Sequence, residues 1–200
     1  MKSDIEKEVI KLAQEKGILR PRDLESSGIA RIYLTRLIKK GLLIKLGPGL
    51  YSTTNNEPTN EHTIAQVCKR IPEGVICLLS ALQFHEITTQ QANKVWIAID
   101  MKSRHPQIST LPVKVLRFSK SALTDGIEEH SIEGIQVKVY NIAKTVADCF
   151  KYRNKIGLEV ALEALRECRR ERKCSNDELW SYAKICRVTN VIRPYMESIE

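Results

Sequence analysis

Glycine and proline divide the first 54 residues into short segments. Gly17 ends one apolar-periodic stretch, Pro21 begins the next, and Gly28 and Gly41 bound a third. Proline in the first turn of a helix and glycine just after the last turn are common start and stop signals. The pattern predicts helices over about residues 4–16 and 21–26, and a third helix between Gly28 and Gly41.

The first helix has a start signal and an apolar stripe. Ser3 and Glu6 have the spacing of a capping box, in which each side chain accepts a hydrogen bond from a backbone amide. The residues at helical spacing are Ile5, Val9, Leu12 and Ala13. After Gly17, Ile18 and Leu19 predict a brief strand.

The third helix has an apolar inner face and a basic outer face. With Leu34 at the centre of the inner face, a rotation of about 100° per residue places Ala30, Leu37 and Ile38 beside it. The outer face consists of Ile32, Arg36 and Lys39, flanked by Arg31, Tyr33, Thr35 and Lys40. On an isolated helix such a basic face is most often only a solvated surface.

Two strand-like runs follow the third helix. Leu42 to Leu46 and Leu50 to Thr53 are separated by Gly47, Pro48 and Gly49, which predicts a hairpin with a glycine-rich turn. Helix, short strand, helix, helix and hairpin form the order of a winged helix-turn-helix, whose third helix fits the major groove of DNA. In this setting the basic outer face favours nucleic-acid binding.

The net charge of the chain, +8, is unevenly distributed. Residues 1–54 hold 11 basic and 6 acidic side chains, a net charge of +5, whereas residues 55–200 hold 21 basic and 18 acidic side chains, a net charge of +3. Residues 1–16 contain four of each sign, so the whole excess of +5 falls between Gly17 and Thr54. Basic side chains there can neutralise DNA phosphates and release counterions.

These residues predict a DNA-binding surface. Near the start of the third helix, Arg31, Tyr33 and Arg36 are expected to contact base edges, and Ile32 packs either on a thymine methyl group or on a second domain. Phosphate contacts are expected from Arg20, Lys39, Lys40 and Lys45. The predicted DNA-binding set is Arg20, Arg31, Ile32, Tyr33, Thr35, Arg36, Lys39, Lys40 and Lys45.

A polar stretch, STTNNEPTNE, separates this module from the rest of the chain. Its turn-forming residues predict a DNA-binding domain over residues 1–54, a linker over residues 55–61 and a second domain over residues 62–200. The second domain starts with a helix that Pro72 stops, and an apolar run then leads into a further helix. Strands are predicted over residues 94–100 and 113–118, around Glu129, and over residues 135–140, followed by helices with a capping box at Ser175 and Glu178. The predicted fold class is α+β: a winged helix-turn-helix followed by a larger mixed α/β domain with a small sheet and C-terminal helices.

The cysteines predict neither a metal site nor a disulfide. The six are Cys68, Cys77, Cys149, Cys168, Cys174 and Cys186, and none has C-x-x-C spacing. Because the chain begins without an export signal, buried free thiols are expected. No metal and no cofactor is predicted.

No motif predicts catalysis, and an enzyme is not expected. The chain has no glycine-rich phosphate loop, no G-x-S-x-G and no HExxH, because His85 and Glu86 lack a second histidine at the required spacing. Asp100 and Asp148 could be metal ligands, but structural roles are favoured, and Lys144 with Asp148 forms an i, i+4 pair. Surface positions explain the remaining histidines, which are His62, His105 and His130.

A second basic cluster lies at the end of a predicted helix. It comprises Arg166, Arg169, Arg170, Arg172 and Lys173. The helix dipole favours cations there, which is one explanation. The alternative is a second contact surface for nucleic acid or for an acidic partner.

No membrane association is predicted. The longest nearly uninterrupted apolar stretch, Val75 to Leu82, is far shorter than the roughly 18 residues that a membrane-spanning helix needs. The N-terminus is charged throughout and lacks the apolar region of a secretory signal. A cytoplasmic protein is expected.

The segment GIARIYLTRLIKKGLLIKLGPGLY resembles the winged-helix signature of AbiEi-type antitoxins. In that signature a helix of the form R-x-x-L-x-R-L-x-x-x-G runs into a strand and a G-x-G-x-Y wing. The similarity continues through LLSALQFHEI, WIAID, VKVLRF and IQVKVYNIAKTVADCFKY, the last of which is similar to a strand-to-helix segment with a Thr-x-x-Asp core. Where many relatives carry a basic residue at the wing tip, this chain has Pro48, which cannot contact a phosphate in the same way.

The resemblance implies a transcriptional repressor that is also the antitoxin of a type IV toxin-antitoxin system, a form of phage defence. Such a protein binds inverted repeats in double-stranded DNA upstream of its own operon and counteracts a nucleotidyltransferase-like toxin, with or without direct contact. Two alternatives remain open: a winged-helix regulator with a ligand-sensing C-terminal domain and no toxin, and a nucleic-acid-processing enzyme subunit.

Overall fold

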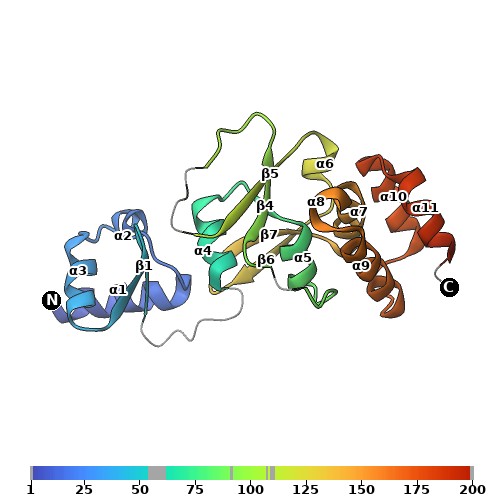
Figure 1. Cartoon of the computed structure of the whole chain (residues 1–200). Helices are drawn as coiled ribbons and strands as arrows, with labels where there is room; N and C mark the ends of the chain where they lie inside the picture. Colours follow the sequence, from blue (N-terminus) through green and yellow to red (C-terminus); the bar gives the residue numbers. More distant parts are fainter. Residues whose placement is uncertain (1, 54–61, 91, 107, 109–110, 199–200) are drawn as a thin grey trace. The chain divides into compact units, whose positions relative to one another are not determined.

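The structure is a computed structural model that describes residues 2–53, 62–90, 92–106, 108 and 111–198. The chain forms two compact units, one of residues Met1–Pro72 and Ser131–Val137, the other of residues Glu73–His130 and Lys138–Glu200 (Figure 1). The predicted linker over residues 55–61 lies outside the described residues, and the division into domains 1–54 and 62–200 stays a prediction. The helix that follows the linker is part of the first compact unit.

The first unit has the predicted order of helices and strands. Its elements are α1 (Lys2–Lys16), α2 (Pro21–Ser26), α3 (Ile32–Lys39), β1 (Leu43–Gly47), β2 (Leu50–Thr53) and α4 (His62–Arg70). Strands β1 and β2 pair antiparallel, and the brief strand predicted after Gly17 is a single bridge between Leu19 and Tyr51. The Ser3 side chain, and with it the predicted capping box, lies outside the described residues. The predicted winged helix-turn-helix is therefore present.

Two glycines fix the direction in which the chain enters and leaves α3. Gly28, after α2, and Gly41, after α3, have φ of 71° and 70°, a left-handed conformation that glycine adopts without a Cβ penalty. After α3, the Gly41 amide donates to the Ile38 carbonyl at 2.9 Å, and the Leu42 amide donates to the Leu37 carbonyl at 2.9 Å. This is a Schellman motif, and it carries the chain directly from α3 into the wing.

A five-stranded mixed sheet has the strand order β5-β4-β3-β7-β6, and it belongs to the second unit except for the part of β6 and β7 within Ser131–Val137. Its strands are β3 (Val75–Ile76), β4 (Val95–Asp100), β5 (Val113–Phe118), β6 (Ile127–Ile132) and β7 (Ile135–Tyr140). Strand β4 runs parallel to β5 and antiparallel to β3, which runs parallel to β7. The predicted α+β class is confirmed. The central strand β3 was not predicted, because two residues are too few to show a period.

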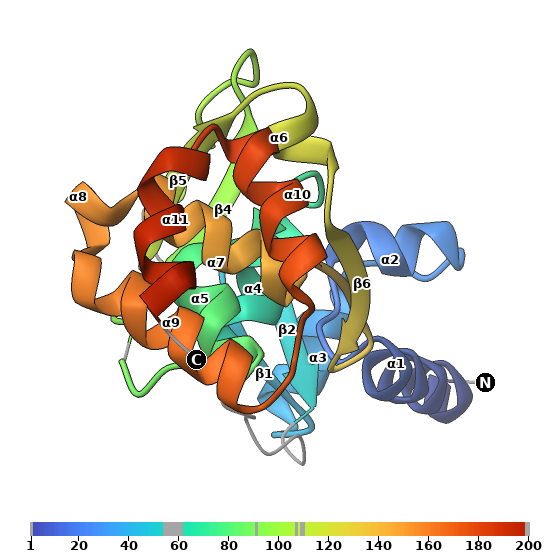
Figure 2. The ribbon, with the colours of Figure 1, turned by 90° about the vertical axis from the view of Figure 1, so that its right-hand side faces the viewer.

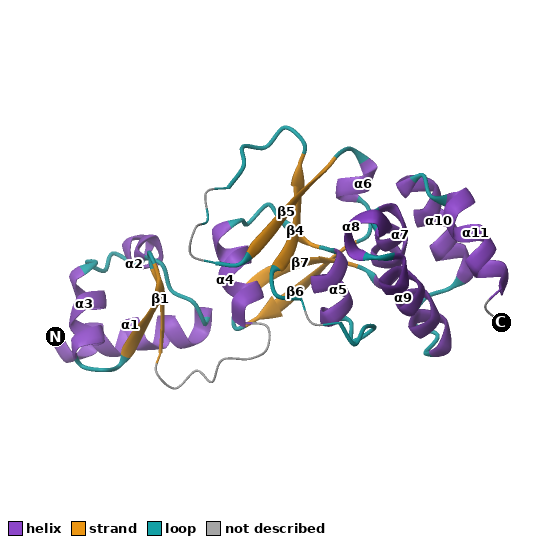
Figure 3. Ribbon diagram, in the orientation of Figure 1, coloured by secondary structure: helices purple, strands orange, loops and turns teal. Residues whose placement is uncertain are grey.

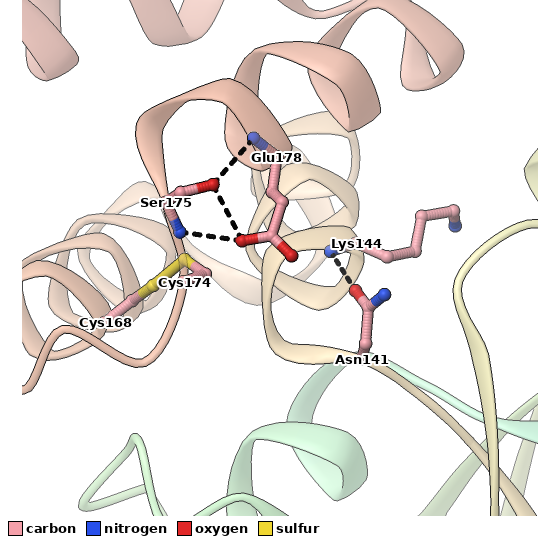
Figure 4. The surroundings of a disulfide bond; sticks show 6 residues. All are labelled: Asn141, Lys144, Cys168, Cys174, Ser175 and Glu178. Carbon is pink, nitrogen blue, oxygen red and sulfur yellow. Dashed lines mark hydrogen bonds between the residues drawn. A yellow bond between two sulfur atoms is a disulfide. The ribbon is translucent and has the colours of Figure 1, made fainter.

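Helices of the second unit pack around α7 (Ile142–Lys151), which directly contacts five of them, α5, α8, α9, α10 and α11. The helices around α7 have the following bounds. They are α5 (Leu78–Phe84), α6 (Ser121–Thr124), α8 (Arg153–Ile156), α9 (Leu158–Arg170), α10 (Asn176–Cys186) and α11 (Thr189–Ser198). Figures 2 and 3 show α9, α10 and α11 gathered beside α7. The Asn141 side chain caps α7, and the predicted capping box of Ser175 and Glu178 begins α10 (Figure 4).

The predicted pair of Lys144 and Asp148 is present at the centre of this helical layer. The Lys144 ammonium donates to the Asp148 carboxylate at 2.5 Å, and both side chains are fully buried. The Cys186 thiol donates to the other carboxylate oxygen at 3.1 Å. Burial raises the pKa of Asp148, although the charge of Lys144 opposes this shift. The pair is therefore a buried structural ion pair.

The expectation that all six thiols are free is wrong for two of them. Cys168, in α9, and Cys174, just before α10, form a disulfide with their Cα atoms 6.2 Å apart (Figure 4). The sequence has no C-x-x-C spacing there, but the turn after α9 brings the two cysteines within the usual Cα separation. The other four cysteines are buried free thiols, as predicted. Burial raises the pKa of the Cys68 thiol to about 12.

Replacement of Cys174 by serine is expected to lower the free energy of unfolding by about 2 kcal/mol, because the disulfide closes only a short loop. Chemical denaturation with and without a reductant measures this effect. The reductant should lower the midpoint of the wild-type protein and leave the Cys174→Ser midpoint unchanged. An equal midpoint for the oxidised and reduced wild-type protein would contradict the disulfide.

Among the described residues, no helix is both long enough and apolar enough to cross a membrane.

Candidate nucleic-acid interface

Helix α3 has the predicted division into a buried and an exposed face. Leu34 and Leu37 are buried, whereas Ile32, Thr35, Arg36 and Lys39 are exposed. These four exposed residues are called the α3 outer face below. Ile32 is 53% exposed, which is unusual for a large apolar side chain. The α3 outer face therefore offers two cations, a hydroxyl and an apolar group to solvent.

One residue assigned to the inner face lies elsewhere. Ala30 is exposed, because α3 begins only at Ile32 and the chain before it is not helical. Ile29 is buried in its place, together with Leu24, Leu34 and Leu37. The helical rotation used to predict the inner face does not extend to a residue before the first turn.

The predicted base-contacting residues differ in their partners. The Arg31 guanidinium donates to Glu25 at 2.5 Å, and this hydrogen bond and the nearby charge raise the pKa of Arg31. The Arg36 guanidinium lies over the ring of the half-buried Tyr33, 5.3 Å from the ring centre. Such stacking orients the guanidinium at little cost in freedom of the side chain. The guanidinium of Arg36 is therefore oriented without an acidic partner among the described residues, whereas that of Arg31 is paired with Glu25.

The predicted phosphate-contacting residues also fall into two groups. Lys39, on the α3 outer face, and Lys45, on β1, are exposed and have no acidic partner among the residues that the structure describes. Lys40 pairs with Glu6 at 2.6 Å. Arg20 is half-buried, and its Nη2 is buried without a hydrogen-bond partner in the described part of the chain. Lys39 and Lys45 are the cations most available to an anion.

Arg22 is an exposed cation that the sequence interpretation missed. It lies in the first turn of α2, and its charge lowers the pKa of Arg20 together with the larger effect of burial. The helix dipole disfavours a cation in this position. An arginine in the first turn of a helix could have been noticed in the sequence, because residues that violate such a local preference are often functional.

The wing has the predicted shape but an apolar surface that was not predicted. A register shift lies between Lys45 and Gly47, and Gly49 has φ of 70°. Leu42 and Ile44, next to α3 in sequence, are both exposed large apolar residues. Since Pro48 has no basic side chain, the wing has Lys45 as its cation. The exposed cations Arg36 and Lys39 therefore lie on α3, and only Lys45 lies on the wing among the described residues.

Asp23 anchors the start of α2. Its carboxylate accepts a hydrogen bond from the Arg20 amide at 2.6 Å and pairs with Lys16 at 3.3 Å and with Lys69 at 3.4 Å. Burial acts to raise the pKa of Asp23, but the hydrogen bond and the two ammonium charges outweigh it and lower the pKa. The ionised carboxylate therefore stabilises the helix that precedes α3.

Replacement of Asp23 by asparagine is expected to cost about 1 to 2 kcal/mol of stability near neutral pH. Because the folded-state pKa of Asp23 lies below its unfolded value, this contribution is present above about pH 4 and is lost as the pH falls through the folded-state value. Denaturant midpoints measured from pH 7 to pH 2 should show the two proteins converging below about pH 4. A constant difference down to pH 2 would refute this role of the Asp23 charge.

The second basic cluster is largely occupied by contacts within its own unit. Arg169 donates to the Met196 carbonyl at 2.7 Å, Arg170 pairs with Glu167 and Glu171, and Lys173 donates to the His85 carbonyl at 3.0 Å. Arg166 and Arg172 are exposed. Arg170 is exposed as well, so Arg166 and Arg172 are the two of the five cations that are exposed and have no acidic partner among the described residues.

The residues considered for metal binding are not brought together. Asp148 is buried with Lys144, and Asp100 accepts a hydrogen bond from the Lys102 amide at 2.7 Å. No group of three or more potential ligands occurs among the described residues. His105 is exposed and His130 is half-buried, but the surface position expected for His62 is wrong, because its mostly buried ring bonds to Glu133 at 2.7 Å.

Comparison with solved structures identifies a similar fold. The chain is similar to the crystal structure of the RV2827C protein from Mycobacterium tuberculosis, with a TM-score of 0.56 and 13% sequence identity. The similarity covers 84% of this chain and 66% of that one, and at this identity it concerns the fold alone. Among the curated proteins, none matches this chain.

The sequence of the N-terminal module itself matches a known family. Residues 7–54 match the family model AbiEi_4, described as "Transcriptional regulator, AbiEi antitoxin". The matched segment begins within α1 and ends just after β2, so it contains the α3 outer face and the wing. Over residues 7–54, the chain is therefore similar in sequence to the AbiEi antitoxin family of transcriptional regulators.

Proposed function

We propose that this protein is a DNA-binding transcriptional repressor and the antitoxin of a type IV toxin-antitoxin system. In this proposal it binds inverted repeats upstream of its own operon and counteracts a nucleotidyltransferase-like toxin. The α3 outer face is the observation that carries the DNA-binding part, because it lies within the matched residues 7–54 and exposes Arg36 and Lys39.

The chemistry of the α3 outer face supports major-groove contact. An arginine can donate two hydrogen bonds to a guanine edge, and an exposed isoleucine can pack on a thymine methyl group. Arg36 is already oriented by Tyr33, and Ile32 gains apolar contact only if a partner covers it. Lys39 and Lys45 provide phosphate contacts that hold the helix in register.

The DNA-binding part is tested with the full chain and the DNA upstream of its operon. Fluorescence anisotropy should give an affinity at least about 1,000-fold tighter than for shuffled DNA of the same length. The affinity should fall steeply with salt, because several phosphates are neutralised. Equal affinity for both DNA molecules would contradict a sequence-specific repressor.

The antitoxin part requires a separate experiment. Co-expression with the adjacent nucleotidyltransferase-like gene product should restore growth, whereas expression of that product alone should arrest it. The variant Arg36→Ala separates the two parts of the proposal, since it should lose repression while its second unit stays intact. If the wild-type protein binds its upstream DNA but does not restore growth, the antitoxin part is wrong and the regulatory part stands.

A further inference from the structure

A cationic pocket in the second unit has no role in the proposed DNA contact. It has a volume of about 750 Å³ and is formed by three segments, residues 119–122, 151–153 and 184–191. The five cations that line it are Lys120, Lys151, Arg153, Lys184 and Arg187. Because these segments are far apart in the sequence, charge counting along the chain could not detect the pocket.

The charge of this pocket is uncompensated. No carboxylate is among its lining residues, and none of the five cations has an ion pair among the described residues. Asp148, which accepts a hydrogen bond from the lining residue Cys186, is fully buried and already paired with Lys144. Arg153 donates to the Phe150 carbonyl at 2.9 Å, which orients its guanidinium without neutralising it. Five like charges around one pocket repel one another, and a bound anion would relieve that repulsion.

Two of the cations have a positive φ, a backbone conformation that favours glycine. Lys120, which precedes α6, has φ of 52°, and Arg187, which follows α10, has φ of 59°. A residue with a side chain in this left-handed conformation costs free energy that glycine avoids. Residues in such conformations are often found at functional sites, and two of the six non-glycine residues with positive φ among those described line this pocket.

The remaining lining residues define the kind of anion. Ser119 and Ser121 contribute hydroxyl groups, and Ala122, Ile185 and Val191 contribute apolar surface. A pocket of this volume is within the usual range for small-molecule ligands. A single phosphate would leave most of the positive charge unpaired, whereas a chain of phosphates carries three to four negative charges, and an attached base would cover the apolar surface.

From this combination we infer that the second unit binds a polyphosphorylated small molecule, with a nucleoside triphosphate as the matching size and charge. The Lys120, Lys184 and Arg187 side chains hold the phosphate chain, and the apolar residues contact the base. This inference is independent of the DNA contact proposed for α3, and it gives the second unit a ligand-sensing role.

The test is calorimetric titration of the full chain with ATP, GTP, inorganic tripolyphosphate and AMP. The variant Lys120→Gly/Arg187→Gly removes two charges and suits the backbone at both positions. The matched control is Arg166→Ala/Arg172→Gly, which removes two exposed cations from the same unit, one of them also at positive φ, 51°. At least one triphosphate should bind the wild-type protein and the control equally, and bind the pocket variant at least about tenfold more weakly.

Three outcomes overturn the inference. One is the absence of binding by ATP, GTP and tripolyphosphate. Another is an equal loss of affinity in the pocket variant and in the control, which would indicate only a general effect of charge. The third is binding of AMP as tight as that of the triphosphates, which would show that the cations do not hold a chain of phosphates. Stronger binding of a nucleoside triphosphate than of tripolyphosphate would support the role of the apolar residues.

Discussion

Replacement of Asp148 by alanine should destabilise the second unit by about 3 to 5 kcal/mol, the usual cost of leaving a buried charge without its partner. Lys144 lies over the rings of Tyr140 and Phe118, 4.1 Å and 5.1 Å from their centres, and no water can reach its fully buried side chain. The aromatic rings attract the ammonium group, but they do not replace a carboxylate. The free energy of unfolding from denaturant titration measures the loss.

Two further variants identify the cause of this loss. The double replacement Lys144→Met/Asp148→Leu removes both charges and should recover most of the stability, because well-packed apolar residues often replace a buried ion pair without cost. The control is Glu15→Ala, which breaks the pair of Lys11 and Glu15, whose side chains are 77% and 60% exposed. Breaking that exposed pair should cost less than about 1 kcal/mol. A cost below 1 kcal/mol for Asp148→Ala would show that the buried pair is not the structural centre of the helical layer.

Replacement of Arg36 by alanine should weaken binding to the upstream DNA by about 1 to 3 kcal/mol, which is about 5-fold to 150-fold in Kd. It should also relax the sequence preference at one base pair, since the lost contact is to a base edge. Replacement of Lys39 by alanine should instead weaken binding to all DNA sequences and reduce the slope of log K against log salt by about one. Anisotropy titrations on specific and shuffled DNA, each at several salt concentrations, separate the two effects.

The chain offers a matched control for these variants. Lys11 is an exposed lysine on α1 of the same module, so Lys11→Ala removes the same charge as Lys39→Ala from a different helix. Its effect on affinity and on the salt slope should be small. If Lys11→Ala reduced the salt slope as much as Lys39→Ala, the protein would bind DNA through its net charge and not through the α3 outer face.

Local signals were enough to predict the N-terminal module. Gly28 and Gly41 act through their own backbone conformation, and the apolar period of α3 needs only eight residues to appear. The prediction went wrong at Ala30, because a helical period says nothing about where the helix begins. The sequence also could not predict that Arg31 and Lys40 form ion pairs, because their partners Glu25 and Glu6 come close to them only in the folded chain.

Features that depend on how the chain folds back on itself were not predictable. The disulfide joins residues that a turn brings together, and the cationic pocket collects side chains from three separate segments. The Lys144 and Asp148 pair was visible as an i, i+4 spacing, but its complete burial follows from the packing of α7 against its neighbours. The spacing of apolar residues in the sequence predicts local structure, whereas the burial and the pairing of charges depend on the folded chain.

The central claim is that the α3 outer face lies against DNA, and site-directed photocrosslinking tests it most directly. A photoreactive p-benzoylphenylalanine is placed at Ile32 or, as the control, at Lys11, and the full chain is irradiated on its upstream DNA. We expect a crosslink to a defined base from position 32 and none from position 11. Undiminished DNA binding with no crosslink from position 32, or with equal crosslinking from both positions, would contradict the account.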